Sequence, residues 1–183
     1  PLIVSEFEFK PFNFSQKLIG FNSNSINIDW LIPDFHIGSG GHTTIFRIIY
    51  HLEQMGHESK IWICGSTHFG SMRKARNTVR SYFFPLNANL EVLDNPRSKQ
   101  LLGDCIFSTS FETCYYSRSI TFHKPRFYLV QDYEPSFSAV GSRYFLAEET
   151  YKFGFQCITA GKWLLGKVKE AGALTEGLDR KSV

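Results

Sequence analysis

The spacing of hydrophobic and polar residues changes in a regular way from residue 26 onward. Short apolar runs of strand length alternate with longer stretches in which apolar residues recur at helical spacing. In the first helical stretch, residues 43–56, the apolar residues at helical spacing are Ile45, Ile48, Ile49, Leu52 and Met55. Gly56 is well placed to end this helix. The pattern predicts strands at 26–35, 59–65, 89–94, 104–110, 126–133 and 155–160. It predicts helices at 43–56, 68–82, 110–119, 142–153 and 161–172, the third of them starting at a capping box of Thr109 and Glu112.

Strands that alternate with helices, several of the strands apolar on both faces, indicate a parallel sheet covered by helices on both sides. We therefore predict an α/β fold, with a Rossmann-like, doubly wound domain at 26–170. Residues 1–25 are typical of an N-terminal arm that packs on a neighbouring surface, or of a disordered tail, and 171–183 of a linker or chain end. A length of 183 residues suits one domain that buries enough surface to need no disulfide or metal.

The composition indicates a globular protein, with 43% hydrophobic and 20% charged residues, and excludes a disordered chain. Aromatic residues reach 16%; most suit a core, while a surplus of exposed rings would fit a sugar-binding or partner surface. The net charge of +3 indicates no particular partner, and no nucleic-acid-binding signature is present. One basic cluster suits either the solvated face of a helix or contact with phosphates or an anionic membrane surface: Arg73, Lys74, Arg76 and Arg80.

The four cysteines show no C-x-x-C spacing and no histidines at zinc-ligand intervals, so we predict no metal site. Cys64, Cys105 and Cys157 lie inside apolar strand-like runs, where cysteine behaves as a small buried hydrophobe. This usage fits a reducing cytoplasm. The sequence has no signal peptide and no apolar run long enough to span a bilayer. We expect a cytoplasmic protein, and the basic cluster permits peripheral contact with the inner face of the cell membrane.

A glycine-rich loop follows the first predicted strand, and its residues are His36, Ile37, Gly38, Ser39, Gly40, Gly41 and His42. In an open parallel sheet, ligands bind at the carboxyl ends of the strands, where such a loop would lie. Glycines let the backbone approach a ligand closely, and free N–H groups at a helix N-terminus attract anions. The loop lacks the G-x-G-x-x-G order and an acidic residue after the next strand, which argues against a dinucleotide site. A tight turn that needs glycine is the alternative; two histidines and a serine favour ligand binding.

A second polar cluster, Gln131, Asp132 and Glu134, follows a buried strand in the segment LVQDYEP. Its two carboxylates would share one side of the chain if the chain stays extended. Carboxylates in such a place can accept hydrogen bonds from sugar hydroxyls or act as a general base. The alternative is that Asp132 caps a turn before Pro135.

A third candidate cluster, Ser108, Thr109 and Ser110 with Glu112, lies at the end of another strand, but helix capping already accounts for part of it. Four aromatic residues near these clusters can stack on sugars, although such residues more often belong to the core: Tyr133, Phe137, Tyr144 and Trp163.

Three long segments are similar to the N-terminal domain of WsaF-type rhamnosyltransferases: IDWLIPDFHIGSGGHTTIFRIIYHLEQMGH, FYLVQDYEPSFSAVGSRYFLAEETYKFGF and QCITAGKWL. The resemblance spans roughly residues 26–168. These enzymes belong to a retaining glycosyltransferase family with the GT-B fold of two Rossmann-like domains. The resemblance implies that this chain is the N-terminal half, which binds the acceptor glycan. It places the donor, expected to be dTDP-rhamnose, mainly on the C-terminal half, with no other cofactor and no metal.

Carried over by position, Gly38 to His42 match the loop that faces the cleft between the two domains. Gln131 and Asp132 stand where many relatives have a His-Asp pair, so Gln131 replaces the histidine. An amide does not titrate, so this position can hold a sugar hydroxyl but not do acid-base work. The family is thought to use a donor phosphate oxygen as the base. The sequence ends before the donor domain, so we expect the 183 residues alone to transfer no sugar.

Three functions therefore remain open from the sequence. The first is the acceptor-binding half of a rhamnosyl or related hexosyl transferase in cell-surface polysaccharide assembly. The second is a stand-alone glycan-binding or partner-binding module without catalysis. The third, which the glycine-rich loop alone would allow, is a nucleotide-binding α/β protein unrelated to sugars.

Overall fold

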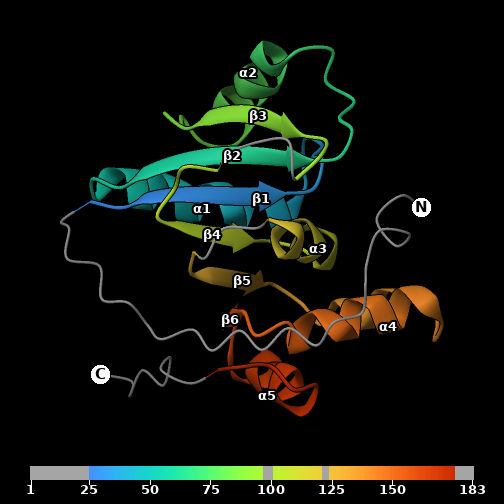
Figure 1. The fold of residues 1–183 in the computed structure, drawn as a ribbon. Helices are drawn as coiled ribbons and strands as arrows, with labels where there is room; N and C mark the ends of the chain where they lie inside the picture. The colour runs from blue at the N-terminus through green and yellow to red at the C-terminus, as the bar shows by residue number, and fades with distance from the viewer. Residues whose placement is uncertain (1–24, 97–100, 121–123, 176–183) are drawn as a thin grey trace.

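The computed structural model describes residues 25–96, 101–120 and 124–175. In it the chain folds around one six-stranded sheet in which all strands are parallel (Figure 1). The strand order is β3-β2-β1-β4-β5-β6, which is the order of Rossmann folds. The strands are β1 (Asn27–Ile32), β2 (Glu58–Cys64), β3 (Asn89–Leu93), β4 (Cys105–Ser108), β5 (Arg126–Val130) and β6 (Gln156–Thr159). The predicted α/β fold with a parallel Rossmann-like sheet is confirmed.

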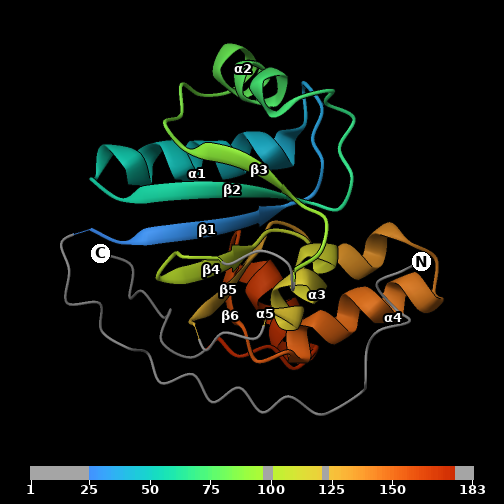
Figure 2. The same ribbon diagram turned by 45° about the horizontal axis from the view of Figure 1, so that its top comes forward.

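Helices cover both faces of this sheet (Figure 2). They are α1 (Gly40–Gln54), α2 (Met72–Tyr82), α3 (Phe111–Ser119), α4 (Ser142–Glu149) and α5 (Lys162–Glu170), with 3-10 turns at η1 (Glu134–Phe137) and η2 (Thr150–Lys152). On one face, Trp30 of β1 packs with Phe46 of α1 and Val79 of α2. On the other face, α3, α4 and α5 pack against β5 and β6. Because both faces are covered, the strands are apolar on both sides, as the sequence pattern predicted.

The chain reverses its direction of travel across the sheet between β3 and β4. It builds β1, β2 and β3 outward to one edge, then crosses back to place β4 beside β1. The loops after β1 and β4 therefore diverge at the carboxyl ends of these two neighbouring strands. This is the switch point at which open parallel sheets bind their ligands.

A buried carboxylate fastens the centre of the sheet. Asp29 of β1 is 1% exposed, and its Oδ1 and Oδ2 accept hydrogen bonds from the Trp62 indole and the Gly103 amide, both at 2.7 Å. Burial raises the pKa of Asp29 although these two donors favour the charged form. The two hydrogen bonds give the buried Asp29 carboxylate the partners that a polar group needs inside a core.

Several predicted boundaries move for local reasons. The strand predicted at 26–35 ends at Ile32, before Pro33, and the one predicted at 126–133 ends at Val130. The helix predicted from residue 68 begins at Met72, because the Ser71 side chain caps it.

The capping box was predicted at the wrong residues. Ser110, not Thr109, is the N-cap of α3, and its partner is Thr113, not Glu112. Thr113 accepts hydrogen bonds from the Thr109 and Ser110 amides, so a Ser-x-x-Thr pair performs the role that we assigned to Thr-x-x-Glu.

The folded unit also continues past residue 170. Ala171 and Ala173 pack against the core beneath α5, and Leu174 forms a parallel bridge with Gln156 at the edge of β6. The segment predicted as a linker therefore begins inside the fold. The predicted arm at 1–25 lies outside the described residues except for Ser25, whose hydroxyl donates to the Gly56 carbonyl.

Candidate functional site at the carboxyl edge of the sheet

The glycine-rich loop connects β1 to α1 at the switch point. Gly38 has a φ of +87°, a conformation that glycine adopts without strain. Ser39 then caps α1, and Gly40 and Gly41 form its exposed first turn. The first amides of a helix have no partner within the helix, so this turn presents N–H groups at the ligand-binding edge of the sheet.

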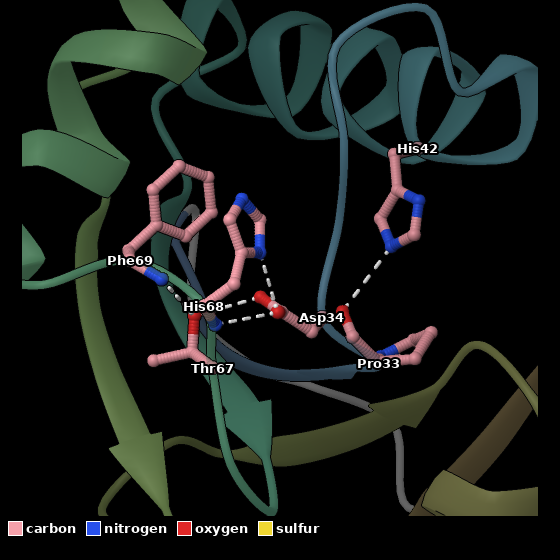
Figure 3. A network of polar contacts seen from close by, with 6 residues as sticks. All are labelled: Pro33, Asp34, His42, Thr67, His68 and Phe69. Atoms are coloured by element: carbon pink, nitrogen blue, oxygen red, sulfur yellow. Dashed lines mark hydrogen bonds and ion pairs between the residues drawn. The ribbon is translucent and has the colours of Figure 1, made fainter.

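His42, predicted as a ligand-binding residue, holds the loop from inside. It is 9% exposed, and its ring Nδ1 lies 2.8 Å from the Ser39 hydroxyl. Figure 3 shows the other ring nitrogen, Nε2, directed at the Pro33 carbonyl oxygen, which is 3.2 Å away. Since a carbonyl can only accept, Nε2 carries the proton and Nδ1 accepts from Ser39. Burial lowers the pKa of His42, which favours this neutral form. His42 and Ser39 thus fix the shape of the loop that Gly38, Gly40 and Gly41 expose.

Gln131 lies directly against this loop, although 90 positions of the sequence separate it from Gly41. A methyl group added at Gly41 would lie 3.6 Å from the Gln131 side-chain nitrogen and 3.8 Å from its oxygen. The fold therefore brings two of the predicted clusters together at the carboxyl ends of β1 and β5. An amide can both donate to and accept from a hydroxyl group, which suits it to hold a sugar.

The two carboxylates of the second cluster separate, because the chain does not stay extended after β5. Asp132 is exposed and accepts a hydrogen bond from the Tyr133 amide at 2.8 Å, in the turn that we considered as its alternative role. Glu134 starts the η1 turn and points inward. Its two oxygens accept from the Phe111 amide at 3.0 Å and from the Tyr128 hydroxyl at 2.5 Å. Asp132 therefore stays accessible, whereas Glu134 is engaged by the protein itself.

Glu134 sits at the N-terminus of α3, since Phe111 is the first residue of that helix. The helix dipole and the two hydrogen bonds favour the carboxylate form, but burial opposes it more strongly and raises the pKa of Glu134 to about 7. This carboxyl group is therefore close to half ionised at neutral pH.

An aspartate–histidine pair that the sequence did not indicate lies beside the loop. Asp34 follows β1, His68 follows β2, and the ring Nδ1 of His68 lies 2.7 Å from Asp34 Oδ2 (Figure 3). The His68 amide and the Thr67 hydroxyl donate to the same carboxylate at 2.9 and 2.7 Å. Burial opposes ionisation, but these hydrogen bonds prevail and hold the pKa of Asp34 below its usual value.

An ionised Asp34 fixes the tautomer of His68. Nδ1 must donate to the carboxylate, which leaves Nε2 as the acceptor in the neutral ring. Figure 3 shows this second nitrogen on the side of the ring away from Asp34. It has no hydrogen-bond partner within the described ranges 25–96, 101–120 and 124–175, and the side chain is 46% exposed. His68 can therefore accept a hydrogen bond from a ligand hydroxyl.

His36 extends this pair toward the glycine-rich loop. Its exposed ring stacks on His68 with the ring centres 4.4 Å apart and an angle of 23° between the planes. The stacked imidazoles join the predicted loop residue to the pair that the sequence did not indicate. The only sequence signal for the pair is its position, because Asp34 lies at the end of one predicted strand and His68 shortly follows the next.

The third cluster is structural. Ser108, Thr109 and Ser110 are all buried, and the Thr109 hydroxyl donates to the Leu31 carbonyl at 2.9 Å. Together with the Ser110 and Thr113 cap, these bonds tie the end of β4 to β1 and to α3. They position the switch point, and a ligand does not reach them.

Other predicted features take simple positions. The basic cluster lies along α2, where Arg73, Lys74 and Arg80 are exposed. The cysteines are free thiols, and burial raises the pKa of both Cys105 and Cys157 to about 12, so neither is a reactive nucleophile. In the part of the chain that the structure describes, no group of His, Cys, Asp or Glu side chains is arranged to hold a metal ion. None of the helices in those ranges has the length and apolar character needed to cross a membrane.

The accessible groups at this edge are glycine amides, the Gln131 amide, Asp132 and the His36–His68 stack. These hydrogen-bonding groups suit recognition of a polyhydroxylated ligand. No protein-family model matches this sequence, and a search of curated proteins finds no match.

Proposed function

We propose that this chain is the acceptor-side, Rossmann-like half of a retaining GT-B glycosyltransferase that transfers rhamnose from dTDP-rhamnose to a cell-surface glycan. The observation that carries the proposal is the proximity of Gln131 to Gly41, where a methyl group added to the glycine would lie 3.6 Å from the Gln131 side-chain nitrogen. These residues belong to the two longest segments that resemble WsaF-type rhamnosyltransferases, and they lie together at the ligand-binding edge of the sheet.

The residues of this half would bind and orient the acceptor. The Gln131 amide and His68 Nε2 are placed to hold hydroxyl groups, and the loop amides of Gly40 and Gly41 lie where the cleft to the donor domain would open. Proton transfer from the acceptor hydroxyl would fall to a phosphate oxygen of the donor, as the family resemblance implies. The second domain would supply the donor site and close the cleft against water.

An isotope-labelled chain allows a direct test by NMR titration. We expect saccharide acceptors to shift the amide signals of residues 38–42 and 131–132, and we expect free dTDP to shift them far less. Shifts produced by dTDP and other nucleotides alone would instead favour the nucleotide-binding alternative.

A stand-alone glycan-binding module is the second candidate, because the Gln131 amide, Asp132 and the Asp34–His68 pair can all bind sugar hydroxyls without taking part in catalysis. Both candidates predict saccharide binding. They differ in whether the complete natural protein transfers sugar.

A further inference from the structure

A cavity lies between η1, α4 and α5, outside the site described above. It has a volume of about 500 Å³ and is lined by side chains from η1, α4 and α5 together with the residue before η1. The lining residues that matter here are Tyr133, Tyr144, Glu148, Trp163, Lys167 and Glu170. We call this cavity the aromatic groove. Figure 1 shows α4 and α5 beside one another next to β6, at the opposite edge of the sheet from α2.

The groove exposes an indole ring that contributes little to the fold. Trp163 stands in the first turn of α5 and is 66% exposed, whereas Leu164 and Val168 of the same helix face the core. An exposed tryptophan offers a ligand a broad apolar face together with one polar N–H group.

Glu148 gives the groove a fixed hydrogen-bond acceptor. Its Oε1 accepts from the hydroxyls of Tyr133 at 3.1 Å and Tyr144 at 3.4 Å. Oε2 has no hydrogen-bond partner among the residues that the structure describes. The two tyrosines thus hold the carboxylate in place while one of its oxygens remains able to accept from a ligand.

The charges of the groove decide which class of ligand it suits. The lining carries two carboxylates, Glu148 and Glu170, against one cation, Lys167, whose ammonium lies 3.0 Å from Glu170. Phosphates and nucleotides are therefore disfavoured. A neutral sugar fits better, because the apolar face of its ring can stack on Trp163 while its hydroxyls donate to Glu148. The volume of about 500 Å³ also lies within the usual range for small-molecule sites.

We infer that the aromatic groove binds a neutral saccharide unit, and that this unit belongs to the acceptor glycan at a distance from the transferred sugar. The identification of the ligand as acceptor rests on the proposed function. The saccharide binding itself does not, because it depends only on the groove. Tyr133 follows Gln131 by two positions, so one extended glycan can reach both places along the carboxyl edge.

The fluorescence of Trp163 can report on binding in the groove. The chain has three tryptophans, and Trp30 and Trp62 are 0% and 2% exposed. Quenching of the fluorescence by acrylamide therefore reports on Trp163. The probes are methyl α-L-rhamnopyranoside, methyl β-D-glucopyranoside and maltotriose, with dTDP as the anionic comparison.

We expect at least one of the neutral saccharides to protect Trp163 from acrylamide in a saturable way, and dTDP not to do so. Glu148→Gln should weaken the binding by about tenfold, because it removes the charge from the acceptor. Phe145→Ala is the matched control, since Phe145 is 54% exposed on α4 but does not line the groove. It should leave the binding unchanged.

Two results would overturn the inference: no protection by any of the saccharides, or protection that Glu148→Gln leaves intact. Failure of the proposed function looks different. If saccharides protect Trp163 but the complete protein transfers no sugar, the saccharide site is kept and the proposed function is wrong. If the protein transfers sugar without protection of Trp163, the saccharide site is wrong and the proposed function is kept.

Discussion

Replacing Glu134 by glutamine should change how the stability of the protein depends on pH. The carboxyl group has an ordinary pKa of 4.5, and burial raises it to about 7 in the folded protein. The folded state therefore binds this proton more tightly than the unfolded state does. The stability that the protonated group contributes is fully present below pH 4.5 and is lost as the pH rises through about 7.

The size of the effect follows from the two pKa values. A difference of about 2.5 units, at 1.36 kcal/mol per unit, corresponds to a loss of up to about 3 kcal/mol in the free energy of unfolding. Glutamine removes the ionisation and can still accept from the Phe111 amide through its oxygen, while its NH2 group faces the Tyr128 hydroxyl.

The assay is urea unfolding of the wild type and Glu134→Gln between pH 5 and pH 8. The free energy of unfolding of the variant relative to the wild type should rise with pH, by up to about 3 kcal/mol. His42 acts in the opposite direction, because burial lowers its pKa and its stabilising effect is lost as the pH falls below 6.5. It is present in both proteins, so its contribution cancels in the difference. A difference that does not change with pH would refute the reasoning, and would mean that hydrogen bonding and the α3 dipole outweigh burial.

Other substitutions test the site and the core. Gly41→Ala should keep the fold but weaken glycan binding, since its methyl group would fill the space next to the Gln131 amide. Gly40→Ala is the control, because its methyl group meets no atom within 4 Å. Equal affinities of the two variants in an NMR titration would contradict a role for the space beside Gln131. His68→Phe should keep the half-exposed ring but lower the affinity for saccharides by about tenfold, while Asp34 keeps its hydrogen bonds from the Thr67 hydroxyl and the residue 68 amide; an unchanged affinity would exclude His68 from the site. Gly103→Ala should lower the free energy of unfolding by about 2 kcal/mol or more in urea titrations, because the new methyl group would lie 2.7 Å from the buried Asp29 carboxylate; a stability equal to the wild type would contradict that packing.

The elements of the fold were largely predictable from the sequence, because hydrophobic periodicity is a local signal. The apolar strands and the helix that Gly56 follows were predicted within a few residues. Boundaries failed where a side chain makes a local hydrogen bond that periodicity does not report. Ser110 and Thr113 form the cap of α3. Thr109 and Glu112 have the same spacing and match the more common residue types of a capping box, but they do not form it.

The candidate site was only partly predictable. The position of the glycine-rich loop after a strand placed it at the ligand-binding edge, and no comparable local signal linked Asp34 to His68, which are 34 positions apart. Their contact depends on β1 and β2 being neighbours in the sheet. The inward orientation of Glu134 was equally hidden, because it depends on the packing of η1 against α3 and β5.

The most direct test of the proposed function is sugar transfer by the complete natural protein. The protein would be incubated with radiolabelled dTDP-rhamnose and a membrane extract of its source as acceptor, beside the 183-residue chain alone. We expect label in the glycan fraction with the complete protein, a loss of incorporation in Gln131→Leu, and no incorporation with the chain alone. Absence of label from the glycan with the folded complete protein, or transfer by the 183 residues alone, would contradict the account.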